Sequence, residues 1–514
     1  MEIDFNLAFK FKELIINSYN EARNINDINI QNKELNDIVT DVDLFMERKI
    51  VNAIQEWFPN HSINSEECGN ISKSSEFEWL IDPIDGTINY SKGLPMYSTT
   101  IALRKNGETI FGIIYDYTSD RFYYAIKNQG AYCNGEKIHV SSKSELSESV
   151  ISFCLTSHYN IEKINEVLEV QKTLAPKVRG LRLIVSSAIE LAWCAEGKID
   201  GCLNVKESYR LGSSAGILLV EEAGGMATNI KGKTREKYDT MLVTNGLIHS
   251  KLVNAMKYVT FVGNITEVIE INSDNIQNPI KKYIAGKAYS EALSASKEGL
   301  NCKILTVMSG LRKNECNSII ADLKNNNIDT SYIEVSNDID NDIKIVFKDE
   351  NNNKIREEDI LNGSAEALTE DIIIQNEELI KNSSYVVCQT KMNKNSIKKL
   401  VQICDRNDVP LIIVPSRPKE ISIIDNSENK EIIEKASLII CDTNELKEIF
   451  GQDVDYEIIL KQYPNKLILI NDNVKYYNGN DYVLINSENI NFNEVGAKDI
   501  FVGKFVYSLT QGWD

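Results

Sequence analysis

The 514-residue chain has little of several features that mark particular classes of protein. It contains four histidines, and its ten cysteines are scattered without a Cys-x-x-Cys pair, so a zinc site is poorly supported. No apolar run approaches the roughly 20 residues of a membrane span, and we expect no membrane partner. The first residues, MEIDFNLAFKFKELI, carry acidic side chains and amphipathic spacing, unlike a signal peptide. These absences predict a cytoplasmic protein with reduced thiols.

Positive charge is scarce as well. The chain has 56 Lys and Arg residues against 75 Asp and Glu residues, which gives a formal net charge of −19. Most of such a surface repels a phosphate backbone, so we expect no nucleic-acid partner. An acidic protein still binds phosphate esters where metal ions invert the local charge.

The length predicts two or more domains, because the chain exceeds one ordinary core. A break in the pattern near 250–262 separates a first domain, 1–257, from a second, 258–514. In the first domain, helical spacing over 4–22 and after Asp41 is followed by short β-rich runs such as WLID and STTIALR. This mixture predicts an α+β fold.

The second domain has a different pattern. Apolar strands such as CKILTVM, YVVCQ and LIIV alternate with helical patterns over 286–298 and 313–325, among others. This alternation predicts an α/β domain with a largely parallel sheet. The stretch FVGNITEVIEI, residues 261–271, predicts one continuous strand near its start.

A pair of aspartates suggests chemistry in the first domain. In WLIDPIDGTINY, Asp82 and Asp85 flank a proline just past an apolar strand end. Gly86 follows, so the backbone can approach a ligand closely and direct an amide at a phosphate oxygen. Hard oxygen ligands in this pattern suit Mg²⁺. Taken alone, DPIDGT also fits a plain polar turn.

Further segments stand in order around this one. They are DIVTDVD (37–43), NSEEC (64–68), SSAIELAWCAEGKIDG (186–201) and EEAGG (221–225). Together the segments strongly resemble the inositol monophosphatase family over the first half of the chain. The resemblance implies an α+β layered sandwich and a Mg²⁺-dependent phosphomonoesterase. Such an enzyme hydrolyses a small sugar, polyol or inositol phosphate by two-metal water activation. The partner implied is a small phosphorylated metabolite, and a homodimer stays open.

The resemblance also implies a set of metal ligands by position. Glu66, Asp82 and the carbonyl of Ile84 match the ligands of the first Mg²⁺. Asp82 and Asp85 match residues that share a second ion. The family's fourth carboxylate is missing, because Leu211-Gly212 occupies the step where the family has Trp-Asp. We therefore expect Gly212 to weaken the second metal site.

The remaining predicted site residues act on water and substrate. Asp43 and Thr87 match the pair that orients the attacking water, and with Glu66 they are the predicted catalytic residues. The amides of Gly86 and Thr87 match the phosphate contacts. The alcohol portion of the substrate is expected to meet Ser186, Ser187 and Ala188.

The resemblance places an acidic residue of the inositol-specific enzymes at Asn204-Val205, where this chain has no carboxylate, so the sugar or polyol stays open. A catalytically weakened fusion, acting as a ligand-binding or regulatory protein, is the alternative. A bifunctional phosphatase–sugar kinase is a further one.

The second domain contains the segments SLIICDTNELKEIFG (437–451) and VGAKDIFVGKF (495–505). Together they resemble motifs of the ribokinase-like carbohydrate kinases, with each motif degraded. VGAKDIFVGKF matches their Gly-Ala-Gly-Asp anion hole, so Gly496 and Ala497 are candidates for phosphate contacts and Asp499 for the base toward a sugar hydroxyl. Lys498 replaces the second glycine, and Lys447 takes the glutamate position of the Asn-x-x-Glu motif.

The chain stops soon after this motif, so we expect a short C-terminal nucleotide pocket. A sugar or nucleotide is the ligand class implied. An inactive kinase-like domain, an active sugar kinase and an unrelated α/β domain all stay open.

Overall fold

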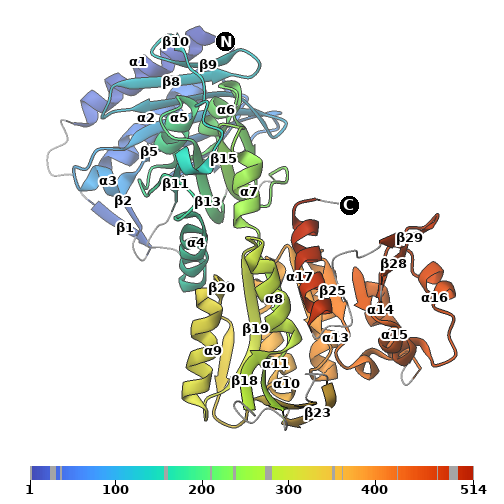
Figure 1. Ribbon diagram of the computed structural model, residues 1–514. Coiled ribbons are helices and arrows are strands. Elements are labelled where there is room, and N and C mark those ends of the chain that lie inside the picture. The colour runs from blue at the N-terminus through green and yellow to red at the C-terminus, as the bar shows by residue number, and fades with distance from the viewer. Residues whose placement is uncertain are drawn as a thin grey trace. The chain divides into compact units, whose positions relative to one another are not determined.

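The computed structural model describes residues 3–23, 30–34, 37–154, 160–208, 211–235, 239–272, 280–349, 354–361, 363–424, 427–471, 473–485 and 496–512. The chain divides into two compact units, unit 1 (Met1–Met256) and unit 2 (Lys257–Asp514), and Figure 1 labels many of their elements. In the described ranges no helix is long and apolar enough to cross a membrane.

Two capped helices open unit 1. In α1 (Phe5–Ala22), the side chain of Asp4 accepts a hydrogen bond from the amide of Leu7. In α2 (Asp41–Trp57), Thr40 and Asp43 form a reciprocal capping box, which satisfies backbone groups that the first turn leaves unpaired. The short pair β1 (Ile30–Glu34) and β2 (Asp37–Thr40) leads into α2.

The larger sheet of unit 1 has eight strands in the order β10-β9-β8-β7-β6-β5-β3-β4. The apolar faces of α1 and α2 pack on one side of it, around Phe11, Trp79 and Phe111. Its strands are β3 (Ser62–Ser65), β4 (Gly69–Ile71), β5 (Phe77–Asp85), β6 (Ser98–Lys105), β7 (Glu108–Asp116), β8 (Arg121–Ile126), β9 (Gly130–Cys133) and β10 (Glu136–Lys137).

The other side of this sheet packs against α5 and α6, which in turn pack against a five-stranded sheet ordered β12-β11-β13-β15-β14. Helices α4 and α7 cover the far face of that second sheet. Unit 1 is therefore a layered α+β sandwich, as predicted. The additional elements are α3 (Thr87–Ser91), α4 (Ile161–Leu174), α5 (Ser187–Ala195), α6 (Ser214–Glu222), α7 (His249–Met256), β11 (Val150–Phe153), β12 (Gly180–Arg182), β13 (Gly201–Ser208), β14 (Met226–Thr228) and β15 (Asp239–Thr244).

Unit 2 is built on a large sheet with the order β20-β19-β16-β24-β25-β26-β27-β28-β29, and β21 pairs with β19. Its strands are parallel from β20 to β27, and the last two are antiparallel. They are β16 (Val259–Val262), β19 (Cys302–Ser309), β20 (Ile328–Asp329), β21 (Ile333–Ser336), β24 (Tyr385–Gln389), β25 (Leu411–Val414), β26 (Leu438–Cys441), β27 (Leu467–Ile470), β28 (Val474–Tyr477) and β29 (Tyr482–Ile485).

Helices cover both faces of this sheet, which confirms the predicted α/β class. One core contains residues of α8, α9 and α17, and the other contains residues of α11 to α16. The helices are α8 (Lys287–Lys297), α9 (Lys313–Asn325), α10 (Gly363–Ala367), α11 (Glu370–Gln375), α12 (Glu377–Lys381), α13 (Lys394–Arg406), α14 (Lys430–Lys435), α15 (Thr443–Phe450), α16 (Tyr456–Gln462) and α17 (Ala497–Thr510).

The prediction of one strand over 261–271 is wrong. The chain breaks after β16, and β17 (Thr266–Asn272) joins a separate sheet with β18 (Ile280–Ala285), β22 (Asp342–Lys348) and β23 (Lys354–Leu361). The physical reason lies in the two patterns that the stretch combines. β16 is apolar and buried throughout, as in a central parallel strand, whereas β17 alternates polar with apolar residues and is largely half-buried.

Candidate functional site

The end of β5 delivers the two aspartates of unit 1. Asp82 and Asp85 are both buried, and the pairing with β6 shifts register between them. The chain then turns at Gly86, whose φ of 90° lies in the left-handed region. A Cβ at this position would lie 2.8 Å from the carbonyl oxygen of Met96. Only glycine fits this turn without displacing backbone, and the turn leads directly into α3.

Asp43 and Thr87 meet across this turn. The Thr87 hydroxyl oxygen lies 3.2 Å from Asp43 Oδ1 and 2.9 Å from the carbonyl oxygen of Ile84, and its one proton serves one acceptor at a time. The other carboxylate oxygen of Asp43 accepts hydrogen bonds from the amide and the hydroxyl of Thr40. Burial raises the pKa of Asp43, and these hydrogen bonds oppose that rise.

The carboxylates near Asp82 destabilise one another. Burial and then repulsion from Glu66 and Asp85 hold the pKa of Asp82 well above its ordinary range. Burial also raises the pKa of Asp85 to about 6, although hydrogen bonds from Ser186 and Ala188 oppose it. Asp82 Oδ1 is buried and has no hydrogen-bond partner among the residues that the structure describes.

These features indicate how well a divalent cation would fit. No three His, Cys, Asp or Glu side chains in the described part of the chain are spaced as a complete ligand set. A cation beside Asp82 would nevertheless pair with its unbonded oxygen and offset the repulsion from Glu66. The carbonyl of Ile84, at the same turn, supplies a neutral oxygen of the kind that Mg²⁺ accepts. The first predicted ion therefore fits the donor chemistry of this cluster.

A second ion fits less well, because Asp85 already has protein partners. Its Oδ2 accepts from the hydroxyl of Ser186 and, at 3.0 Å, from the amide of Ala188. Its Oδ1 lies 3.3 Å from the hydroxyl oxygen of Ser187. The structure thus brings the predicted substrate contacts onto Asp85 itself.

Gly212 faces the same cluster. A Cβ at this position would lie 3.0 Å from Asp82 Oδ2 and 3.6 Å from Asp85 Oδ1. A side chain here would point at both aspartates, and the glycine contributes no carboxylate. The side chain of Glu207, the nearest acidic residue in sequence, lies outside the described residues.

A strained residue precedes the serines that contact Asp85. Val185 has φ of 61°, which is costly for a β-branched side chain. Its neighbour Ile184 is held from two sides. The amide of Ile184 donates to Glu190 Oε1 at 3.2 Å, and Asn89 Nδ2 donates to the carbonyl of Ile184 at 2.9 Å. Sequence reasoning missed this strained segment. The sequence feature that could have indicated it is Glu190, a carboxylate in the mostly apolar stretch SAIELAWCA.

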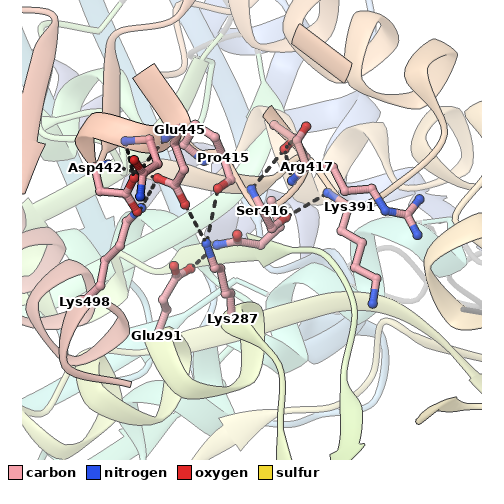
Figure 2. A network of polar contacts seen from close by, with 12 residues as sticks. Lys287, Glu291, Lys391, Pro415, Ser416, Arg417, Asp442, Glu445 and Lys498 are labelled. Carbon is pink, nitrogen blue, oxygen red and sulfur yellow. Dashed lines mark hydrogen bonds and ion pairs between the residues drawn. The ribbon is translucent and has the colours of Figure 1, made fainter. Parts of the chain in front are cut away.

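The predicted kinase site of unit 2 contains a network of charged side chains (Figure 2). Gly496, in the left-handed region at φ of 87°, precedes α17. Lys498 in the first turn of α17 forms a short ion pair with Glu445, and its Nζ lies 3.9 Å from Asp442. Lys287 at the start of α8 lies 3.2 Å from the other oxygen of Glu445. The two lysines therefore share one carboxylate, each on a different oxygen of Glu445.

The base candidate of unit 2 lies among these charges. Burial raises the pKa of Asp499 to about 6, against the opposing effect of Lys287 and Lys498. Burial and then Asp499 raise the pKa of Glu291, which is fully buried, well above its ordinary value. Both lysines of the cluster are paired with Glu445, so little positive charge is left to attract an added phosphoryl group.

Sequence reasoning missed Glu445, although its spacing from Asp442 carried a signal. Asp442 and Glu445 form a capping box that starts α15, the reciprocal pattern of an acidic or hydroxyl residue followed three residues later by glutamate. The second oxygen of Glu445 accepts from the amide of Asp442 at 3.0 Å. The helix cap thus fixes the carboxylate that binds both lysines.

A layered α+β unit with buried carboxylates at a glycine turn is the architecture of a phosphoric monoester hydrolase, here joined to a ribokinase-like α/β unit. The chain belongs to the inositol monophosphatase family, whose model matches residues 1–265, and residues 256–514 match the pfkB family of carbohydrate kinases. The family assignment made from sequence motifs is confirmed for both units.

Individual relatives match unit 1. The chain is 34% identical over 227 residues to fructose-1,6-bisphosphatase/inositol-1-monophosphatase of Thermotoga maritima, covering 43% of this chain and 84% of that protein. It is 34% identical over 222 residues to inositol-1-monophosphatase of Bacillus subtilis, covering 42% and 82%. A solved IMPase structure from Thermotoga maritima is 30% identical, covers 49% of this chain and 97% of its own, and gives a TM-score of 0.44.

The strain at Val185 predicts that glycine is more stabilising than alanine at this position, the reverse of the usual order. Val185→Gly should be more stable than Val185→Ala by about 1 kcal/mol, because alanine keeps the left-handed strain that glycine removes. The free energy of unfolding from urea titration measures the difference. The same two substitutions at Val150, in β11, should give the ordinary order with alanine more stable. An ordinary order at both positions would show that Val185 is not strained.

The raised pKa of Asp499 predicts a pH-dependent gain on substitution. Between its ordinary value of 3.8 and its folded value of about 6, folding takes up a proton, so the wild type loses stability as pH rises through this range. Asp499→Asn should be the more stable protein at about pH 8 and lose that advantage near pH 4. Denaturation midpoints across this range provide the measurement, with the exposed Asp338→Asn as control. A difference that does not change with pH would contradict the raised pKa.

Proposed function

We propose that unit 1 is a Mg²⁺-dependent phosphomonoesterase acting on a small sugar, polyol or inositol phosphate. The observation that carries this proposal is the carboxylate cluster of the buried Asp82 and Asp85 with the exposed Glu66 beside them, and the Asp43–Thr87 pair at the same turn. Both relatives described above are named as inositol-1-monophosphatases, and one also as a fructose-1,6-bisphosphatase. Their names support the substrate class and leave the particular sugar or polyol to experiment.

The roles of the residues follow from their places. When bound, Mg²⁺ lowers the pKa of a water molecule and stabilises charge on the phosphate oxygens. Glu66, Asp82 and the carbonyl of Ile84 would hold the ion. Asp43 has a raised pKa and reaches Thr87, so this pair is suited to orient a water molecule and accept its proton.

The substrate would lie against the turn and the start of α5. The amides of Gly86 and Thr87 would donate to phosphate oxygens, since the glycine turn lets the backbone approach closely. Ser186, Ser187 and Ala188 would border the alcohol portion. These three residues also contact Asp85. A substrate that displaces them would therefore displace the Asp85 carboxylate as well.

For unit 2 we infer a ligand-binding or regulatory role without phosphoryl transfer. The supporting observation is the Lys498–Glu445–Lys287 network at the predicted anion hole (Figure 2). In an active anion hole, backbone amides and a helix dipole stabilise the transferring group. Here Lys498 stands in that turn with its charge already neutralised by Glu445.

Loss of one carboxylate tests the proposed function of unit 1. Phosphate release from a panel of sugar, inositol and nucleotide monophosphates at millimolar Mg²⁺ should occur with the wild type. It should fall about 100-fold or more in Asp82→Ala, which removes a predicted metal ligand. The matched control is Asp116→Ala, another buried aspartate of unit 1 that bonds Thr118 and Ser119 instead. Equal phosphatase activity of Asp82→Ala and the wild type would contradict the proposed function.

Gly212 allows a test in the direction of gain. Gly212→Asp should lower the Mg²⁺ concentration needed for half-maximal activity by about tenfold, because it adds a carboxylate facing Asp82 and Asp85. Gly212→Asn has nearly the same size and no charge, so it separates the electrostatic effect from crowding. If both variants respond to Mg²⁺ alike, position 212 does not report on the metal site.

A further inference from the structure

Glu47 is a fully buried carboxylate of α2 to which no role has yet been given. It lies one helical turn after Asp43, and residues four apart share a face of a helix. Asp43 contacts Thr87 at the start of α3. Glu47 contacts a different element, the hairpin formed by β3 and β4.

The contacts of Glu47 bracket a single residue of that hairpin. Its Oε1 accepts a short hydrogen bond from the hydroxyl of Ser65 and, at 2.8 Å, one from the amide of Glu67. Glu66, the predicted metal ligand, lies between these two donors. Glu47 therefore holds the backbone on both sides of Glu66 and leaves the Glu66 side chain to the cluster.

Glu66 lies in the turn of this hairpin. Ser65 pairs with Gly69 across the two strands, so residues 66–68 form the connecting turn. The amide of Glu66 donates to the carbonyl of Ile81 in β5 at 3.3 Å, which ties the turn to the strand that carries Asp82. Hydrogen bonds to a carboxylate are stronger than those between neutral groups, so the two hydrogen bonds to Glu47 are a firm restraint on the backbone on both sides of Glu66.

We propose that Glu47 is a positioning residue for the metal site: by binding Ser65 and Glu67, it fixes the Glu66 carboxylate beside Asp82. This inference rests on the proposed phosphatase function of unit 1. An apolar residue at position 47 would fill the same core with α1 and β5 at a lower desolvation cost, which makes the carboxylate costly for packing alone.

The test measures metal binding directly. Isothermal titration of Mg²⁺ without substrate, and Mn²⁺ binding followed by electron paramagnetic resonance, are compared for wild type, Glu47→Gln and Glu47→Leu. Glutamine keeps an acceptor oxygen for both donors, so the dissociation constant should change less than about threefold, whereas leucine should weaken binding about 10- to 100-fold. Ser65→Ala removes one of the two donors and should give an intermediate loss.

A second variant controls for stability. Met46→Ala removes a buried side chain from the same turn of α2 and destabilises the core by about 2–5 kcal/mol, while the hydrogen bonds from Glu47 to Ser65 and Glu67 stay in place. If folded Met46→Ala binds Mg²⁺ like the wild type while Glu47→Leu does not, positioning is supported. Loss of affinity in both, or wild-type affinity in Glu47→Leu, overturns it.

The same titration separates this inference from the proposed function. A wild-type protein that binds neither Mg²⁺ nor Mn²⁺ contradicts the phosphatase proposal itself, and Glu47 then has no metal site to position. A wild type that binds metal, together with a Glu47→Leu variant of unchanged affinity, leaves the phosphatase proposal intact and rejects the role of Glu47 alone.

Discussion

Repulsion among the carboxylates around the buried Asp82 is the constraint on which the arrangement of unit 1 depends. Glu66 and Asp85 raise the pKa of Asp82, and each of these three residues is held by a different part of the fold. β5 carries the two aspartates, the β3–β4 hairpin carries the glutamate, and α5 supplies donors to Asp85. The layered sandwich can therefore be described as a frame that keeps like charges together until a cation or a proton balances them.

Unit 2 also contains a cluster of acidic side chains, but here lysines of the protein compensate the negative charge. Its cluster of acidic groups contains its own cations, Lys287 and Lys498, so the charges balance within the protein. Such a site gains rigidity from its ion pairs, which are largely buried and held by the cap of α15. Because the lysines are already paired with carboxylates, the electrostatic attraction between this site and a phosphate is weak. The two units thus differ: unit 1 leaves negative charge that a bound cation could compensate, whereas unit 2 compensates its charge with its own lysines.

Much of the fold was predictable because hydrophobic spacing and caps act locally. The apolar strands and the helix over 313–325 followed from such patterns, and both family assignments followed from motifs. The break between β16 and β17 did not, since a single apolar-rich stretch hides a change from a central strand to a half-buried one. Motifs also predicted that Asp82 and Asp85 lie together, and the structure places both at the end of β5. Val185 and Glu47 were not, because a backbone angle and a contact between α2 and a distant hairpin depend on tertiary structure.

Asp43 has two tasks at once, and this affects what its presence means in other members of the family. Its carboxylate closes the capping box that begins α2, and the same group faces Thr87. Selection for a folded sandwich alone would preserve it, even in a descendant that no longer hydrolyses anything. Asp82 caps no helix, and its buried Oδ1 bonds to nothing in the described residues. If Asp82 has the proposed metal-binding role, its loss or retention in a lineage is therefore the more informative record of whether catalysis is still under selection.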